Sequence, residues 1–129
     1  LLAVSAMAAD LYSPVVLGVD RSEVYLPLLG QQRVALVVNQ ASLSQGEHTI
    51  DRLRAQNVNL VKLFALEHGI RGDGGAGEGI PDSIDPETGL PIVSLYGSRY
   101  KPTPEMLADV DVIVFDIQDV GVRFYTYIS

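Results

Sequence analysis

The stretch RVALVVN, Arg33–Asn39, decides the fold class that the sequence predicts. It is a continuous run rich in β-branched residues, with polar residues at its ends. Such runs are typical of parallel strands that are buried on both faces. Comparable apolar runs follow along the chain at Asn59–Leu66, Pro91–Gly97 and Val112–Phe115.

Helical patterns lie between these runs. His48–Asn57 has apolar residues at helical spacing, and Asn57 is the expected stop. Thr103–Leu107 begins with a threonine N-cap and a proline at the first helical position. A short apolar run at Val15–Asp20 fits a first strand of the alternation. Strands that alternate with helices predict an α/β fold with a parallel sheet flanked by helices.

Length and composition predict one domain and argue against nucleic acid as a partner. The chain has 129 residues, 47% of them hydrophobic, which is enough for a real core. Its formal net charge is −7 and its nine Lys and Arg residues are scattered, whereas nucleic-acid binding needs a basic stripe. No segment is long and apolar enough to span a bilayer, and without cysteine no disulfide can form.

Both ends of the sequence suggest a piece of a longer, exported protein. The opening LLAVSAMAAD is typical of the end of a signal peptide, because Ala6 and Ala8 give the A-x-A pattern of cleavage after Ala8 or Ala9. We therefore expect residues 1–9 to be a signal-peptide remnant and the protein to be periplasmic or extracellular. The last residues, FYTYIS, lie within apparent structure, so the domain at 10–129 is expected to be incomplete at its C-terminus.

Polar residues follow three of the predicted strands. In open α/β sheets the ligand crevice lies outside the carboxyl ends of the strands. If the three strands are parallel, these residues converge on one edge of the sheet and form a candidate site. Polar residues after a strand also make turns and helix caps, so a structural role remains open at each position. The three clusters are Asn39 and Gln40; Glu67 and His68; and Asp116, Gln118 and Asp119.

The glycine-rich segment LEHGIRGDGGAGE, Leu66–Glu78, contains a G-x-G-x-x-G pattern at Gly72, Gly74 and Gly77. A dinucleotide site needs a strand directly before this pattern and a helix directly after it. Here EHGIR intervenes and EGIPDS follows, with Pro81 and no helical period. We interpret the match as accidental and expect no redox cofactor.

Several side chains are of types that bind metal ions. No H-x-x-x-H or C-x-x-C spacing occurs, which disfavours zinc. Oxygen ligands suit Mg²⁺ or Ca²⁺, so a metal-dependent phosphoesterase stays open as an alternative. The candidate ligands are Glu67, His68, Asp73, Glu78, Asp116 and Asp119.

The same carboxylates fit glycoside hydrolysis, which uses one carboxylic acid and a second carboxylate. Burial of Glu67 beside Leu66 would raise its pKa, as an acid requires. Arg71 and Arg123 are candidate clamps for an anionic substrate, and the aromatic residues after Arg123 suit the face of a sugar ring.

Four motifs in order make the chain resemble the exo-β-N-acetylmuramidase (NamZ-like) family, long classed as a domain of unknown function. They are LFALEHGIRGDGGAGE, DPETGLPIVSLYG, KPTPEML and DVIVFDIQDVGVRFYTYIS, and the earlier VALVVNQAS also fits. The similarity covers residues 15–129. It implies a Rossmann-like N-terminal domain, followed by a smaller domain absent from this chain, with the active site in the cleft between them.

The resemblance also implies an activity and its residues. The family removes N-acetylmuramic acid from the non-reducing ends of peptidoglycan fragments, without a cofactor. Glu67 is then expected to be the catalytic acid, and Glu78, Asp116 or Asp119 the second carboxylate. A wall-binding module without catalysis is the alternative. The residues expected to line the sugar site are Asn39, Gln40, His68, Arg71, Asp73, Gln118, Arg123 and Tyr125.

Overall fold

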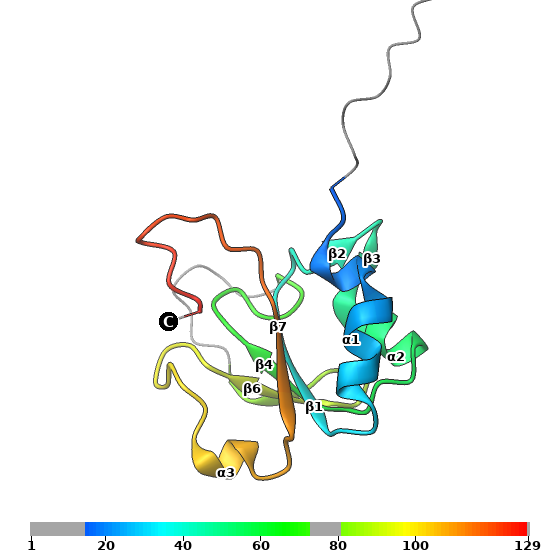
Figure 1. Ribbon diagram of the computed structural model, residues 1–129. Coiled ribbons are helices and arrows are strands. Elements are labelled where there is room, and N and C mark those ends of the chain that lie inside the picture. The colour runs from blue at the N-terminus through cyan, green and yellow to red at the C-terminus, as the bar shows by residue number, and fades with distance from the viewer. Residues whose placement is uncertain (1–14, 73–80, 129) are drawn as a thin grey trace, which may run out of the picture.

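The computed structural model describes residues 15–72 and 81–128 (Figure 1). Five strands form one sheet in the order β5-β6-β4-β1-β7, and two short strands form a separate hairpin. The elements are η1 (Gly18–Asp20), α1 (Ser22–Leu29), β1 (Val34–Val38), β2 (Leu43–Ser44), β3 (Glu47–His48), α2 (Thr49–Ala55), β4 (Leu60–Ala65), β5 (Ser83–Ile84), β6 (Pro91–Ser94), α3 (Pro104–Leu107) and β7 (Val112–Asp116).

The sheet is mainly parallel, which confirms the predicted α/β class. Strand β1 pairs in parallel with β4 on one side and β7 on the other, and β6 pairs in parallel with β4. Among the described strands of this sheet, only the short β5 runs antiparallel, against β6. Because Val38 is in register with both Ala65 and Asp116, the last residues of three strands meet at one edge of the sheet.

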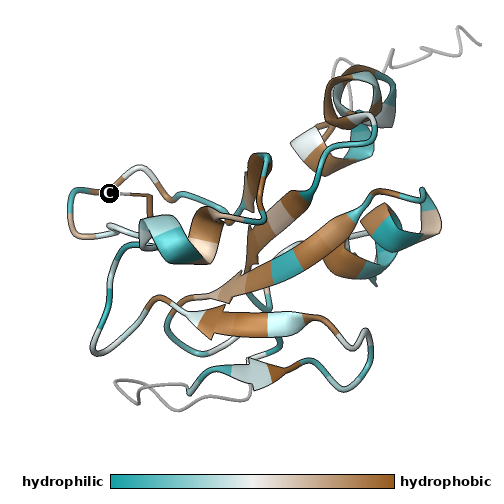
Figure 2. Cartoon of the chain, turned by 90° about the horizontal axis from the view of Figure 1, so that it is seen from below, coloured by the Kyte–Doolittle hydropathy of each residue, from teal (hydrophilic) through white to brown (hydrophobic). Residues whose placement is uncertain are grey.

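Helices cover both faces of the sheet (Figure 1). On one face, here called the α1/α2 face, Leu36 and Leu63 of the sheet pack with Ile50 and Leu53 of α2. On the opposite α3 face, Ala35, Val37 and Phe64 of the sheet form a second core, against which α3 packs with Met106 and Leu107. The central strands, which supply residues to both cores, consist mainly of hydrophobic residues (Figure 2).

Burial on both faces holds for β1 and does not hold for β7. All five residues of β1 are buried. In β7, Ile113 and Phe115 are 44% and 36% exposed. β7 is the last strand of the order and pairs only with β1, so less of the described chain covers it. No helix among the described residues is long and apolar enough to cross a membrane.

The prediction of a strand at Val15–Asp20 is wrong. Val15 and Val16 are exposed, and Gly18–Asp20 form the 3-10 helix η1. The carboxylate of Asp20 accepts hydrogen bonds from Ser44 and Arg52, which fix η1 against the β2–β3 hairpin and α2. An apolar run becomes a strand only when a neighbouring strand pairs with its backbone, and the run itself does not reveal that partner. Helix α1, directly after η1, was not predicted.

The two predicted helices are confirmed, together with the Thr103 cap of the second; the His48 cap of α2 was not predicted. The backbone N–H of Ile50 donates to Nδ1 of His48 at the start of α2, and Asn57 adopts a left-handed conformation (φ 59°) beyond its end. Thr103 Oγ1 accepts from the backbone N–H of Met106 at the start of α3. The predicted signal-peptide remnant, residues 1–9, lies outside the described residues.

Candidate active site

The turn after β4 presents Glu67 at the carboxyl edge of the sheet. The backbone N–H of Gly69 donates to the carbonyl of Leu66 at 3.1 Å and closes the turn. His68 and Gly69 both have positive φ angles, 71° and 76°. A non-glycine residue rarely adopts this conformation, so the turn around Glu67 is held by its surroundings.

Glu67 lines a cavity of about 510 Å³ on the α3 face, here called the tyrosine cleft. Leu66 and Leu95 form part of its wall, and both belong to the core of that face. In this cleft, residues that follow β4 and β6 lie next to a segment that follows β7 in the sequence. The tyrosine cleft is lined by Leu66, Glu67, Leu95, Tyr96, Tyr100, Phe124, Tyr125, Thr126 and Tyr127.

Two tyrosine hydroxyls hold the carboxylate of Glu67. Tyr96 donates to Oε1 at 3.1 Å, and Tyr127 donates to Oε2 at 3.5 Å. The hydrogen bond to Glu67 is the main cause that raises the pKa of Tyr96. Burial, followed by the charge of Glu67, raises the pKa of Tyr127. Both hydroxyls therefore remain protonated donors across the physiological range.

The aromatic rings of the cleft also contact one another. The rings of Tyr96 and Tyr100 meet edge to face at 6.2 Å, and those of Tyr125 and Tyr127 at 4.8 Å. Phe124 and Tyr100 are 86% and 69% exposed at the cleft. A carboxylate among exposed aromatic rings can bind a sugar face and transfer a proton beside it.

The two predicted residues after β1, Asn39 and Gln40, do not line the tyrosine cleft. Asn39 is buried, and its Oδ1 accepts from the backbone N–H of Ala41 at 2.9 Å. Gln40 lines an open polar depression together with His48, Asp51 and Arg71. The structure thus brings Gln40 and Arg71 together, away from the residues that line the tyrosine cleft.

Arg71 is engaged by two carboxylates. It lies 3.5 Å from Asp85 Oδ2 and 3.1 Å from Glu87 Oε2. Burial raises the pKa of Asp85, but the hydrogen bond from Thr88 and the ion pair with Arg71 outweigh it, so that the pKa lies below its ordinary value. Arg71 thus compensates a buried charge of the fold.

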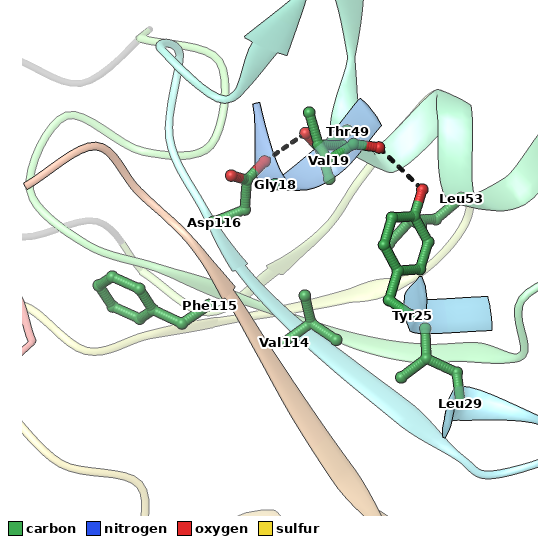
Figure 3. Close-up of a pocket in the computed structure, with 9 residues that line it drawn as sticks. All are labelled: Gly18, Val19, Tyr25, Leu29, Thr49, Leu53, Val114, Phe115 and Asp116. Atoms are coloured by element: carbon green, nitrogen blue, oxygen red, sulfur yellow. Dashed lines mark hydrogen bonds between the residues drawn. The ribbon is translucent and has the colours of Figure 1, made fainter. Parts of the chain in front are cut away.

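Asp116 lies on the α1/α2 face, where its Oδ2 accepts a hydrogen bond from Thr49 of α2 (Figure 3). Its backbone carbonyl accepts from Ser42 Oγ at 2.5 Å. The side chain lines a small, largely apolar cavity of about 160 Å³ with Tyr25 and Leu53. Asp116 and Glu67 therefore do not share a cavity in the described structure.

The remaining predicted residues fall in several places. Asp119 Oδ1 accepts from the backbone N–H of Gly121 at 2.7 Å, and Gln118 is exposed in the same segment. Arg123 is exposed, and Tyr125 lines the tyrosine cleft. His68 directly follows Glu67 in the turn and is half-buried. Asp73 and Glu78 lie outside the described residues.

Tyr96, Tyr100 and Tyr127 are residues that the sequence reasoning missed. Tyr96 falls inside the predicted strand Pro91–Gly97, but β6 ends at Ser94, so Tyr96 follows β6 as Glu67 follows β4 and obeys the same rule for strand ends. The partnership of Tyr127 with Glu67 joins positions 60 residues apart and had no local signal. Within residues 15–72 and 81–128, no three His, Cys, Asp or Glu side chains are grouped as metal ligands.

Fold and cleft together define an α/β protein with a Rossmann-like sheet and one carboxylate set among aromatic rings. A family model described as exo-beta-N-acetylmuramidase NamZ, N-terminal, matches residues 34–129. The chain belongs to this family, which confirms the resemblance inferred from its motifs.

Individual relatives agree with this assignment. The chain is 47% identical over 106 residues to the peptidoglycan beta-N-acetylmuramidase NamZ of Bacillus subtilis (strain 168), a match that covers 81% of this chain and 26% of that protein. Crystal structures of two DUF1343 family proteins from Bacteroides fragilis NCTC 9343 give TM-scores of 0.74 and 0.72, at 37% and 47% identity. They are covered to 29% and 26% of their length, by 89% and 82% of this chain. The chain thus spans about a quarter of the curated relative.

Proposed function

We propose that this chain carries part of the active site of a glycoside hydrolase that releases N-acetylmuramic acid from the non-reducing ends of peptidoglycan fragments. The position of Glu67 carries the proposal: its carboxylate lies in a cleft of exposed aromatic rings at the carboxyl edge of the sheet. The 47% identity to a peptidoglycan beta-N-acetylmuramidase supports a glycosidase role and names the substrate class.

In the proposed reaction Glu67 gives its proton to the glycosidic oxygen as the bond to the anomeric carbon breaks. A second carboxylate either takes a proton from water, which then attacks that carbon, or attacks the carbon itself. Water finally supplies the hydroxyl of the released sugar and the proton that Glu67 lost. A separation of about 5 to 5.5 Å between the carboxyl groups gives retention, and about 6.5 to 9.5 Å gives inversion.

The candidates for the second carboxylate differ in their surroundings. Asp116 faces α2 and is bound to Thr49, which favours a structural role. Asp119 lies in the segment between β7 and the residues that line the cleft. Glu78 lies outside the described residues. We propose that Asp119 or Glu78 acts with Glu67, and the variants Asp119→Asn and Glu78→Gln distinguish them by which one loses turnover.

The lactyl carboxylate of the proposed sugar needs a cation. Arg71 already faces Asp85 and Glu87. Arg123 directly precedes the segment that lines the cleft and forms no ion pair within the described part of the chain. We propose Arg123 as the residue that binds the lactyl group.

We further propose that the protein acts outside the cytoplasm, because peptidoglycan lies there and the sequence opens with a signal-peptide pattern. Cell fractionation of the natural protein with an antibody against this chain tests the location. Recovery in the periplasm or medium supports it, and recovery in the cytoplasm alone contradicts it.

The decisive experiment compares Glu67→Gln with wild type in the full natural protein, with a chromogenic N-acetylmuramide as substrate. We expect turnover to be lost while binding of the sugar is retained. Glu23→Gln is the matched control, since Glu23 is exposed on α1 and pairs with Arg21, remote in the fold from the cleft. Turnover by Glu67→Gln at the wild-type rate would refute the proposed role.

The same assay separates the alternatives. Saturable binding without turnover by the wild-type protein would indicate a wall-binding module. Activity on phosphate esters that a chelator abolishes would indicate a metal-dependent phosphoesterase.

A further inference from the structure

We propose that Tyr96 is a positioning residue for Glu67: its hydroxyl fixes the carboxyl group in the orientation that glycoside cleavage needs, and Tyr127 supports it through the other carboxylate oxygen. This inference rests on the proposed function of Glu67. It adds two residues to the site that the sequence reasoning did not assign.

The backbone places the Tyr96 hydroxyl with little freedom. The backbone N–H of Leu95 donates to the carbonyl of Ala65 at 2.8 Å, so the ladder between β6 and β4 continues to the edge of the cleft. The backbone N–H of Tyr96 donates to Ser94 Oγ at 3.3 Å, and the ring of Tyr100 packs against the Tyr96 ring. The distance between Tyr96 and Glu67 is therefore set by two adjacent strands of the sheet.

Tyr127 reaches the same carboxylate from a distant part of the sequence. Its 3.5 Å bond to Oε2 is longer than the 3.1 Å bond from Tyr96 to Oε1, so we expect it to be the weaker of the two. Tyr125 packs edge to face against Tyr127 and limits its rotation. With one hydroxyl on each oxygen, the plane of the Glu67 carboxyl group is defined.

This arrangement matters for catalysis because glutamate has a flexible side chain. A displacement of about 1 Å between reacting groups can reduce the rate on the order of a hundredfold. The hydroxyls of Tyr96 and Tyr127 also affect how readily Glu67 binds a proton, because a hydrogen-bond donor to a carboxylate favours its charged form. Other titratable groups at the site are the cleft residues Tyr100 and Tyr125, and His68, which follows Glu67 in the chain.

A purely structural role for Tyr96 predicts a different result from a positioning role. A structural residue changes the amount of folded protein, and thereby scales the rate at every pH. A positioning residue lowers kcat with little change in KM. It also moves the limb of the pH profile that Glu67 controls toward higher pH when its hydroxyl is removed. The position of that limb does not depend on the amount of folded enzyme.

The test measures kcat, KM and the pH profile of Tyr96→Phe in the full natural protein on the chromogenic N-acetylmuramide. We expect kcat to fall about tenfold or more, KM to stay within about twofold, and the limb to shift upward. Tyr127→Phe should act in the same direction with a smaller effect. Tyr100→Phe removes a hydroxyl from the same cleft without removing a hydrogen bond to Glu67. Its kinetic constants show how much the loss of a tyrosine hydroxyl from the cleft changes the rate by itself.

Two outcomes separate this inference from the proposed function. If Glu67→Gln is inactive while Tyr96→Phe keeps the wild-type kcat and an unshifted pH profile, positioning by Tyr96 is refuted and the role of Glu67 stands. If Glu67→Gln is active, both the proposed role of Glu67 and the positioning role of Tyr96 are refuted. If Tyr96→Phe is poorly folded, the pH profile of its folded fraction still decides, because an unshifted limb refutes positioning and a shifted one supports it.

Discussion

Glu67 and Asp116 leave the same edge of the sheet toward its opposite faces. Val38 of β1 is in register with both Ala65 of β4 and Asp116 of β7. The ends of β4 and β7, which flank β1, therefore lie about 10 Å apart, twice the usual strand spacing. Asp116 turns to the α1/α2 face and binds Thr49, whereas Glu67 lines the tyrosine cleft on the α3 face. The two carboxylates therefore meet different partners, and we expect different consequences when each is changed.

Removal of the Asp116 carboxylate should reduce stability. Asp116→Ala leaves the Thr49 hydroxyl with the carbonyl of Ser42, at 3.2 Å, in place of a charged acceptor, and loss of a hydrogen bond to a charged group costs about 1.5–3 kcal/mol. Asp116→Asn keeps an acceptor oxygen and should lose less. Urea unfolding of both variants measures the difference.

A double-mutant cycle with Thr49→Val tests whether the contact itself is responsible. If Asp116→Ala costs as much in the Thr49→Val background as in wild type, the bond between the two side chains does not explain the loss.

The ion pair between Arg33 and Asp111 should make stability depend on pH in the acid range. Arg33 donates to Asp111 from its guanidinium and from its backbone N–H, at 2.7 and 2.8 Å, and these bonds lower the pKa of Asp111 to about 2 from 3.8. The folded state therefore favours the charged carboxylate. Its contribution is present above about pH 4 and is lost as the pH falls toward 2.

Urea midpoints of wild type and Asp111→Asn should accordingly differ at pH 6 and converge between about pH 4 and pH 2. Both side chains are partly exposed, at 46% and 39%, so added salt should reduce the difference at pH 6. A gap between the midpoints that stays constant from pH 6 to pH 2 would show that this carboxylate does not titrate as described.

Gly72 should resist substitution more than a glycine of the same conformation elsewhere. Gly72 and Gly46 have φ angles of 81° and 82°, which strain any residue with a Cβ by about 1–2 kcal/mol. A Cβ at Gly72 would also lie 3.1 Å from Cβ of Gln40, whereas at Gly46 nothing lies within 4 Å. Thermal unfolding should show a larger loss for Gly72→Ala than for Gly46→Ala. Equal losses would mean that Gln40 moves aside without cost.

His48 should stabilise the start of α2 through both ring nitrogens. Its Nδ1 accepts from the backbone N–H of Ile50 at 3.3 Å, and Nε2 lies 3.0 Å from the carbonyl of Asn39, to which it donates. His48→Ala removes both bonds and should cost about 1–2 kcal/mol in urea unfolding. His48→Asn supplies a capping oxygen and should recover part of this loss. No recovery would indicate that the bond to Asn39 dominates.

The strands and their directions were readable from the sequence because buried parallel strands need continuous apolar runs. Arg33–Asn39 and Asn59–Leu66 gave β1 and β4 to within two residues at each end. The prediction of a strand at Val15–Asp20 failed, because an apolar composition does not say whether a neighbouring strand is available for pairing. Its place is taken by η1, fixed by Asp20.

The sequence by itself determined that polar residues gather at one edge of a parallel sheet, since strand direction alone sends every carboxyl end there. Only the tertiary structure decided which face each residue takes and what it meets. Side chains alternate between the two faces of a strand, so a single residue of offset separates Asp116 from the α3 face. The partners of Glu67 lie 29 and 60 positions away, at Tyr96 and Tyr127, and such pairings arise only when the strands assemble.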